Sequence, residues 1–103
     1  MIKKNTLPKG PSLPDDKVSV TFELPATVWA KQVAVVGEFN GWDPTAHLLR
    51  QERDGTWRLS VQLDRHRRYQ FRYLLNGTQW LNDWAADDYV PNRSGGFNSV
   101  VST

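Results

Sequence analysis

The sequence predicts an all-β protein, an immunoglobulin-like antiparallel β-sandwich of about seven short strands. Apolar and polar residues alternate over 17–24 and again over 57–63, which is the period of a half-buried strand. Asp54-Gly55 and Asn76-Gly77 are signals for tight hairpin turns. No stretch has the 3.6-residue apolar period of an amphipathic helix. Short strands separated by turns at regular spacing are typical of a sandwich.

The expected strands follow one another between turn-forming residues. We expect them over 17–24, 33–36, 48–49, 57–63, 69–75, 79–81 and from Phe97 to Val101. Pro25 ends the first of them, because proline cannot donate to a strand ladder. Residues 82–96 are rich in Asn, Asp, Pro and Gly and are expected to form a loop.

The chain of 103 residues is long enough for one domain with a core of its own and has no cysteine. We place this domain at residues 17–103. Residues 1–16 contain Pro8, Pro11 and Pro14, and such a segment builds neither a helix nor a central strand. The sequence therefore predicts an extended tail or linker over 1–16.

The charge balance excludes some classes of protein. The net charge is only +2, whereas dedicated nucleic-acid binders usually carry a large basic surplus. The basic run Arg65–Arg68 fits a solvated turn better than a phosphate-binding patch, because no aromatic residues are interleaved with it. No segment has the ~20 apolar residues that cross a membrane. We expect a cytoplasmic protein without nucleic-acid or membrane partners.

Candidate catalytic residues are few. His47 and His66 have no metal-ligand spacing and are expected to be surface or turn residues. Asp83, Asp87 and Asp88 offer the carboxylates of a glycoside hydrolase, but loop aspartates more often cap turns. We therefore expect no enzyme activity, no metal and no cofactor.

The five tryptophans divide by their position in the pattern. Trp57 is in register with the apolar residues of its strand and is expected in the core. Trp29 precedes the second strand and is expected to pack at an edge. Trp42, Trp80 and Trp84 fall in or beside loops, where a tryptophan either covers the edge of the core or forms a binding surface.

Trp42 and Trp80, together with Arg72 on the polar side of its strand, indicate a surface that binds sugars. The flat C–H face of a pyranose fits an indole ring, and each such stack contributes about 1 kcal/mol by analogy with aromatic pairs. Arg72 offers a fork of donors for hydroxyl groups, and Asn98 offers both a donor and an acceptor. An open site of this kind is expected to bind weakly, with a Kd of roughly mM to μM.

Four segments of the chain resemble a known family. They are Val-Ala-Val-Val-Gly-Glu-Phe-Asn-Gly-Trp-Asp at 33–43, Tyr-Gln-Phe-Arg-Tyr at 69–73, Asn-Gly-Thr-Gln-Trp at 76–80 and Gly-Gly-Phe-Asn-Ser-Val-Val at 95–101. In order and spacing they are similar to the family-48 carbohydrate-binding modules. These include the early-set domains of isoamylases and branching enzymes and the glycogen-binding domain of the AMP-activated protein kinase β-subunit. The resemblance covers about residues 17–103.

The resemblance implies an immunoglobulin-like sandwich that binds α-1,4-glucans such as glycogen and starch. It implies that Trp42 and Trp80 are the sugar platforms and that Arg72 and Asn98 form hydrogen bonds to the sugar. Two features depart from the glycogen-binding members. Ser94 and Gly96 stand where those members have Leu and Thr, and one extra residue lies between the Asn76-Gly77 turn and Trp80.

Two functions from different classes follow. The first is non-catalytic binding of an α-1,4-linked glucan by stacking on an exposed surface. The second is a protein-interaction or structural early-set domain that has lost sugar binding, as in many enzyme-attached members of the family that the chain resembles. A glucan-metabolising enzyme is a further candidate partner.

Overall fold

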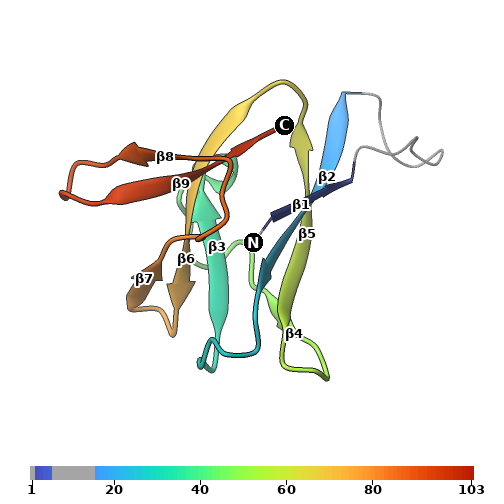
Figure 1. Ribbon diagram of the computed structural model, residues 1–103, viewed down its shortest axis with the longest axis vertical. Helices are drawn as coiled ribbons and strands as arrows, with labels where there is room; N and C mark the ends of the chain where they lie inside the picture. Colours follow the sequence, from blue (N-terminus) through green and yellow to red (C-terminus); the bar gives the residue numbers. More distant parts are fainter. Residues whose placement is uncertain (1, 6–15) are drawn as a thin grey trace.

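The computed structural model describes residues 2–5 and 16–103, and these residues form two antiparallel sheets that pack face to face (Figure 1). The first sheet has the order β1 (Ile2–Asn5), β2 (Lys17–Leu24), β5 (Trp57–Asp64) and β4 (Arg50–Gln51). The second has the order β3 (Val33–Gly37), β6 (Arg68–Leu75), β9 (Phe97–Ser102) and β8 (Asp88–Pro91), with β7 (Gln79–Leu81) also paired to β6. A 3-10 turn, η1 (Glu38–Asn40), follows β3. The predicted all-β immunoglobulin-like sandwich is confirmed.

The core lies between the two sheets. Because side chains alternate across a strand, the register of β2 and β5, which pairs Val20 with Val61 and Phe22 with Leu59, turns their apolar residues to the inside. Phe22 meets Phe71 of the other sheet edge-to-face at 5.1 Å between ring centroids. The predicted core residue Trp57 is 4% exposed and belongs to this core.

A polar contact within the core joins the second sheet to the chain that follows β7. The hydroxyl of buried Tyr73 donates to Asp83 Oδ2 at 2.7 Å, and Ala85 N donates to Asp83 Oδ1 at 2.8 Å. Burial raises the pKa of Tyr73 well above its ordinary value, so this hydroxyl stays protonated and can donate even in alkaline solution. Asp83 thus caps a turn, as the sequence predicts for an aspartate in this segment.

Three strands differ from the expectation. Ile2–Asn5, expected in a tail over 1–16, form the edge strand β1 on β2, and the three tail prolines lie outside the described residues. Asp88–Pro91, expected in a loop, form β8 on β9. The short strand expected at 48–49 is displaced to Arg50–Gln51. All three are short edge strands, whose formation depends on the neighbouring strand more than on their own composition.

Trp29 was expected to pack at an edge of the sandwich, and this prediction is wrong. The side chain is 90% exposed. Val28 and Ala30 on either side both pack against the core, so the residue between them is turned outward.

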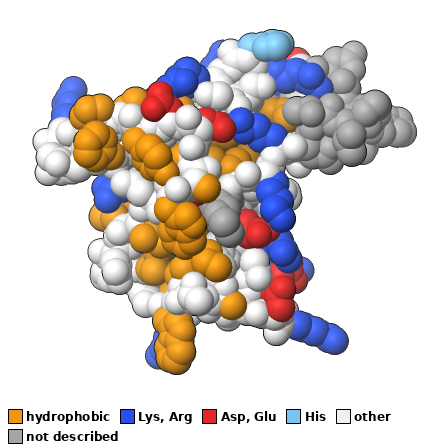
Figure 2. All heavy atoms as spheres, viewed as in Figure 1, with side chains coloured by type: hydrophobic (Ala, Val, Ile, Leu, Met, Phe, Trp, Pro, Cys, Tyr) orange, Lys and Arg blue, Asp and Glu red, His pale blue; other side chains and the backbone are white. Residues whose placement is uncertain are grey.

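Several charged side chains form ion pairs. Arg68 of the basic run bonds Asp88 at 2.7 Å, and Arg67 lies 3.9 Å from Asp64. Charges of both signs lie along the part of Figure 2 where Figure 1 draws β1, β2 and β5, whereas exposed apolar side chains gather over β8 and β9. No helix within residues 2–5 and 16–103 is long and apolar enough to cross a membrane.

Candidate functional site

Trp42, Arg72, Trp80 and Asn98, four residues from separate segments, lie together on the outer face of the second sheet. Arg72 and Trp80 share this face, because Trp80 pairs with Leu74, two residues along β6 from Arg72. The four side chains line one open groove of about 350 Å³. The other residues that line it are Asn92, Arg93 and Ser94.

Trp42 reaches the groove through an unusual backbone. Gly41 has a φ of 66° and Trp42 itself has a φ of 61°, so two consecutive residues are left-handed. Glycine adopts this conformation freely, but for a bulky residue it is strained by about 1–3 kcal/mol. Trp42 N donates to Gly37 O at 2.9 Å, which closes the loop, and the indole is 39% exposed. Such strain is typical of a side chain held in place for function.

The residues before Trp42 fix this loop on the sandwich. The ring of Phe39 packs against Phe22 in the core at 5.4 Å between centroids. Asn40 Oδ1 accepts from Gly37 N at 3.1 Å, and Asn40 Nδ2 donates to Val35 O at 3.0 Å. His47, expected to be a surface or turn residue, is half-buried after this turn and contacts Asn40 Nδ2 through Nδ1 at 2.9 Å. The hydrogen bonds of Asn40 therefore hold the loop against β3.

Asp43 fixes the other side of the Trp42 loop. Its Oδ1 accepts from Thr45 N at 2.9 Å and from Thr45 Oγ1 at 2.8 Å. These two hydrogen bonds lower the pKa of the Asp43 carboxyl. The carboxylate therefore stays ionised to lower pH than an ordinary aspartate and keeps the turn after Trp42 closed.

Trp80 and Arg72 form a stacked pair in the groove. The Asn76-Gly77 turn has φ values of 53° and 72°, the geometry of a tight hairpin, and brings β7 back along β6. The guanidinium carbon of Arg72 lies 5.4 Å from the centroid of the Trp80 ring, within the range of a cation–π contact. Arg72 Nε is buried and has no hydrogen-bond partner among the described residues. The Trp80 ring remains 44% exposed.

Asn98 belongs to a row of amide groups along the groove. Its Nδ2 donates to Gln70 Oε1 at 3.0 Å, and its Oδ1 accepts from Asn92 Nδ2 at 3.2 Å. Asn92 Oδ1 accepts in turn from Ser94 Oγ at 2.9 Å and from Gly96 N at 3.0 Å. The β8–β9 turn is thereby held in shape beside Asn98.

A second hollow of about 720 Å³ adjoins the groove, and both are lined by Trp42, Asn92, Arg93 and Asn98. Glu38, Gln70 and Pro91 complete its lining. Glu38 Oε1 accepts from Gln70 N at 2.7 Å, so this carboxylate is hydrogen-bonded to the backbone of β6. Trp42 therefore borders both the groove and this hollow. An extended ligand that lies on its ring has room to continue past it.

The side chains of the groove are suited to stacking and hydrogen bonding. Two half-exposed indoles, two guanidinium groups and two amides line it, and none of the described carboxylates does. Asp83, Asp87 and Asp88, which the sequence left open as glycosidase carboxylates, lie outside this lining. Asp87 Oδ2 accepts from Ser102 N at 2.7 Å. Within the ranges that the structure describes, no three His, Asp or Glu side chains form a group that could hold a metal ion.

Sequence reasoning missed Asn92, Arg93 and Gln70. Asn92 and Arg93 lie in a segment without any strand period, so their direction could not be predicted. Gln70 alternates with Arg72 along β6, and that spacing of two was a signal that both side chains share a face.

The comparison with protein families matches residues 10–89 to carbohydrate-binding module 48, the isoamylase N-terminal domain. The chain belongs to this family of carbohydrate-binding modules, as the four segments predict. Among similar proteins is a 1,4-alpha-glucan branching enzyme, GlgB 2, of Xanthomonas campestris, which is 45% identical over 59 residues, 50% of this chain and 8% of the enzyme. The branching enzyme GlgB of Leifsonia xyli is 42% identical over 60 residues, 53% of this chain and 8% of the enzyme. The chain thus matches less than a tenth of the length of either relative.

Proposed function

We propose that this protein binds α-1,4-linked glucan without catalysis, by stacking glucose rings on Trp42 and Trp80. The observation that carries the proposal is that two half-exposed indoles from separate segments line one open groove. Membership of a carbohydrate-binding-module family supports the ligand class. The names of the relatives, 1,4-alpha-glucan branching enzymes, support the linkage.

Two kinds of group in the groove would contact the sugar. The indoles offer apolar faces to the C–H side of successive sugars. The guanidinium groups of Arg72 and Arg93 offer donors to hydroxyls, and the Asn98 amide offers a second acceptor lone pair beyond its bond to Asn92. A shallow groove leaves much of the ligand in water, so we expect a Kd of roughly mM to μM.

The purified chain is expected to migrate more slowly in a native gel that contains glycogen than in a gel without it. Maltoheptaose is expected to change its tryptophan fluorescence, whereas a β-1,4-linked cello-oligosaccharide of similar length is not. The reason is that the curvature of an α-1,4 chain and the flat ribbon of a β-1,4 chain present their sugar faces differently. Equal migration in both gels, together with no fluorescence change at mM maltoheptaose, would contradict the proposal.

Arg72→Met is expected to weaken glucan binding severalfold without lowering stability. Methionine keeps the apolar stem of the side chain as far as the position of Nε but removes the donors that the sugar hydroxyls need. It also removes the buried Nε–H of Arg72, and an unsatisfied buried donor costs about 1–3 kcal/mol. Titration calorimetry with maltoheptaose and urea unfolding measure the two effects.

Arg68→Met is the matched control for Arg72→Met. Arg68 lies on the same face of the same strand, is bonded to Asp88 and does not line the groove. Glucan affinity is expected to stay unchanged in this variant. If Arg72→Met also binds glucan with unchanged affinity, the guanidinium of Arg72 has no part in recognition.

A second candidate function is contact with a partner protein, such as a glucan-metabolising enzyme. The observation that favours it is a set of large exposed aromatic side chains outside the groove, namely Trp84, Tyr89 and Phe97, which are 54%, 41% and 53% exposed. Aromatic residues of this kind are enriched at protein interfaces. Under this alternative the glycogen gel would not retard the chain.

A further inference from the structure

Trp29 is the most exposed large apolar side chain among the described residues. It is 90% exposed, compared with 39% for Trp42 and 44% for Trp80. It lies in the connection from β2 to β3, at the end of the sandwich where the β6–β7 turn also lies. An indole so exposed gains almost nothing from the core, since burial of a large apolar side chain stabilises by about 1.5–3 kcal/mol. The fold alone therefore gives no reason for tryptophan at this position.

The backbone on both sides of Trp29 is held in place. The carbonyl of Val28 accepts from Trp57 Nε1 at 3.3 Å. On the other side, Asn76 Oδ1 accepts from Lys31 N at 2.8 Å and from Gln32 N at 3.2 Å. The backbone N–H of Asn76 donates to Gln32 O at 2.8 Å. Trp29 is thus presented to solvent from a connection anchored to the core and to the β6–β7 turn.

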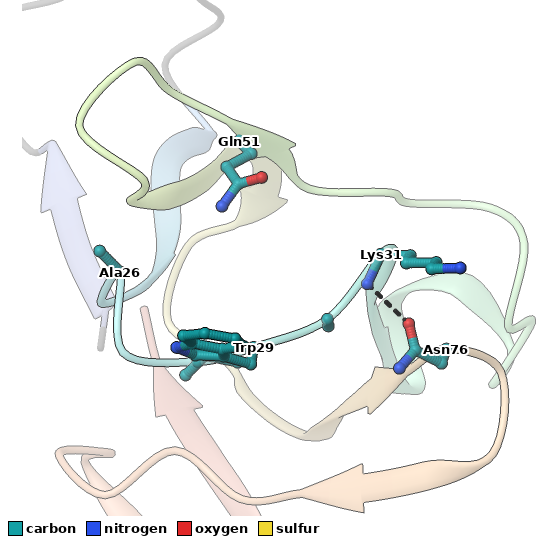
Figure 3. A pocket seen from close by; sticks show the side chains of 7 residues that line it. Ala26, Trp29, Lys31, Gln51 and Asn76 are labelled. Carbon is teal, nitrogen blue, oxygen red and sulfur yellow. Dashed lines mark hydrogen bonds between the residues drawn. The ribbon is translucent and has the colours of Figure 1, made fainter.

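A hollow of about 460 Å³ lies beside Trp29, and this volume is within the range of small-molecule sites. Its lining combines the apolar residues Ala26, Val28, Trp29 and Ala30 with the polar residues Lys31, Gln51 and Asn76. Figure 3 shows the Trp29 ring nearly edge-on, with one flat side toward the space below Gln51. Among the described residues of this lining only Lys31 is charged, and its side chain extends away from Trp29 (Figure 3).

The chemistry of the hollow selects a neutral ligand with a flat C–H face and several hydroxyls. The indole offers the flat apolar surface. Gln51 Nε2 donates to Gly55 O at 3.3 Å, and the Gln51 and Asn76 amides in the lining offer donors and acceptors for hydroxyl groups. A single cation among neutral groups is too little for a phosphate or carboxylate site, which usually has a fork of donors or several cations.

We propose that Trp29, Gln51 and Asn76 form a second contact site for α-glucan, separate from the groove of Trp42 and Trp80. The inference rests on the function proposed above. Asn76 connects the sites along the chain, because it lines the hollow and also begins the turn that leads to β7 and Trp80. A long or branched polysaccharide can reach both sites of one rigid domain, and the second contact is then intramolecular. Two weak sites together retain glycogen far better than either alone.

The test follows the indole N–H signals of the protein during titration with maltoheptaose in 1H–15N NMR spectra. We expect the Trp29 signal to shift along with those of Trp42 and Trp80, with a binding curve of its own. In the Trp42→Ala variant the Trp29 signal should shift as before. Retardation in the glycogen gel should fall by about tenfold in Trp29→Ala, because multivalent contact multiplies weak affinities.

The outcomes separate this inference from the proposed function. If the Trp42 and Trp80 signals shift and the Trp29 signal does not, the second site is overturned and the groove stands. If only the Trp29 signal shifts, the second site is supported and the groove assignment fails. If no indole signal shifts at mM maltoheptaose, both proposals fall. Trp29→Phe, which keeps a smaller ring at the same exposed position, should retain part of the glycogen binding if stacking is the mechanism.

Discussion

Replacing Trp42 by alanine is expected to lower the affinity for maltoheptaose by roughly tenfold or more and to abolish most of the retardation in a glycogen gel. One lost stack of about 1–1.5 kcal/mol corresponds to approximately a tenfold change in Kd. Trp42 lines both the 350 Å³ groove and the adjoining 720 Å³ hollow, so its removal interrupts the surface at the place where the two meet. Titration calorimetry and gel retardation measure the loss.

The fold is expected to survive this substitution. The indole is 39% exposed and belongs to neither apolar cluster of buried residues. The variant Trp42→Gly extends the argument, because glycine accepts a φ of 61° without strain. It should lose glucan binding to the same extent and unfold at a higher urea concentration than Trp42→Ala.

Trp84→Ala is the control for Trp42→Ala. Trp84 is a loop tryptophan that is 54% exposed and does not line the groove, the adjoining hollow or the hollow beside Trp29. Its removal is expected to leave glucan affinity unchanged. A Trp42→Ala variant that binds as tightly as the Trp84→Ala variant would show that Trp42 is not a sugar platform.

Two features of the groove lower the free energy of unfolding. Trp42 is held at a φ that suits glycine, and Arg72 buries an Nε–H without a partner among the described residues. Each costs about 1–3 kcal/mol. Under the function proposed, glucan binding accounts for both, and this is why Trp42→Gly and Arg72→Met are expected to spare or raise stability while binding is lost.

Strand alternation made most of the sandwich predictable. The β2 and β5 segments have a period of two over eight residues each, and this period fixes which side chains enter the core. The same reasoning put Arg72 on the outer face of β6. The strands that could not be predicted, Ile2–Asn5 and Asp88–Pro91, have four residues each and pair at an edge. Their backbone is set by distant partners, which no local pattern reveals.

Side-chain direction in the connections was the least predictable feature. The groove gathers Asn92, Arg93 and Ser94 from the β8–β9 turn, where no period exists to indicate a direction. The position of Trp29, just before the second strand and after Pro25, predicts packing at an edge. Its real direction follows from Val28 and Ala30, which both pack against the core and leave the residue between them outside. Only the three-dimensional path of the chain decides such cases.

Gly37→Ala is expected to destabilise the protein by about 2–3 kcal/mol, a large effect for the addition of one methyl group. Gly37 is the last residue of β3, pairs with Phe71 and has an extended backbone, so backbone strain is not the reason. A Cβ at this position would lie 2.5 Å from Gln70 O and 2.7 Å from Phe71 Cβ. Neither atom is the end of a flexible side chain, so β3 and β6 must move apart. Urea unfolding measures the loss.

The substitution is also expected to remove glucan binding at temperatures where the variant remains folded. Gly37 O accepts the N–H of Trp42, and Gly37 N donates to Asn40, so a shift of Gly37 moves the loop that presents the indole. Gly96→Ala is the control for stability, because a Cβ there meets Asn92 at 3.6 Å, an ordinary contact. If Gly37→Ala unfolds at the same urea concentration as Gly96→Ala, close approach of the two strands is not what requires glycine at position 37.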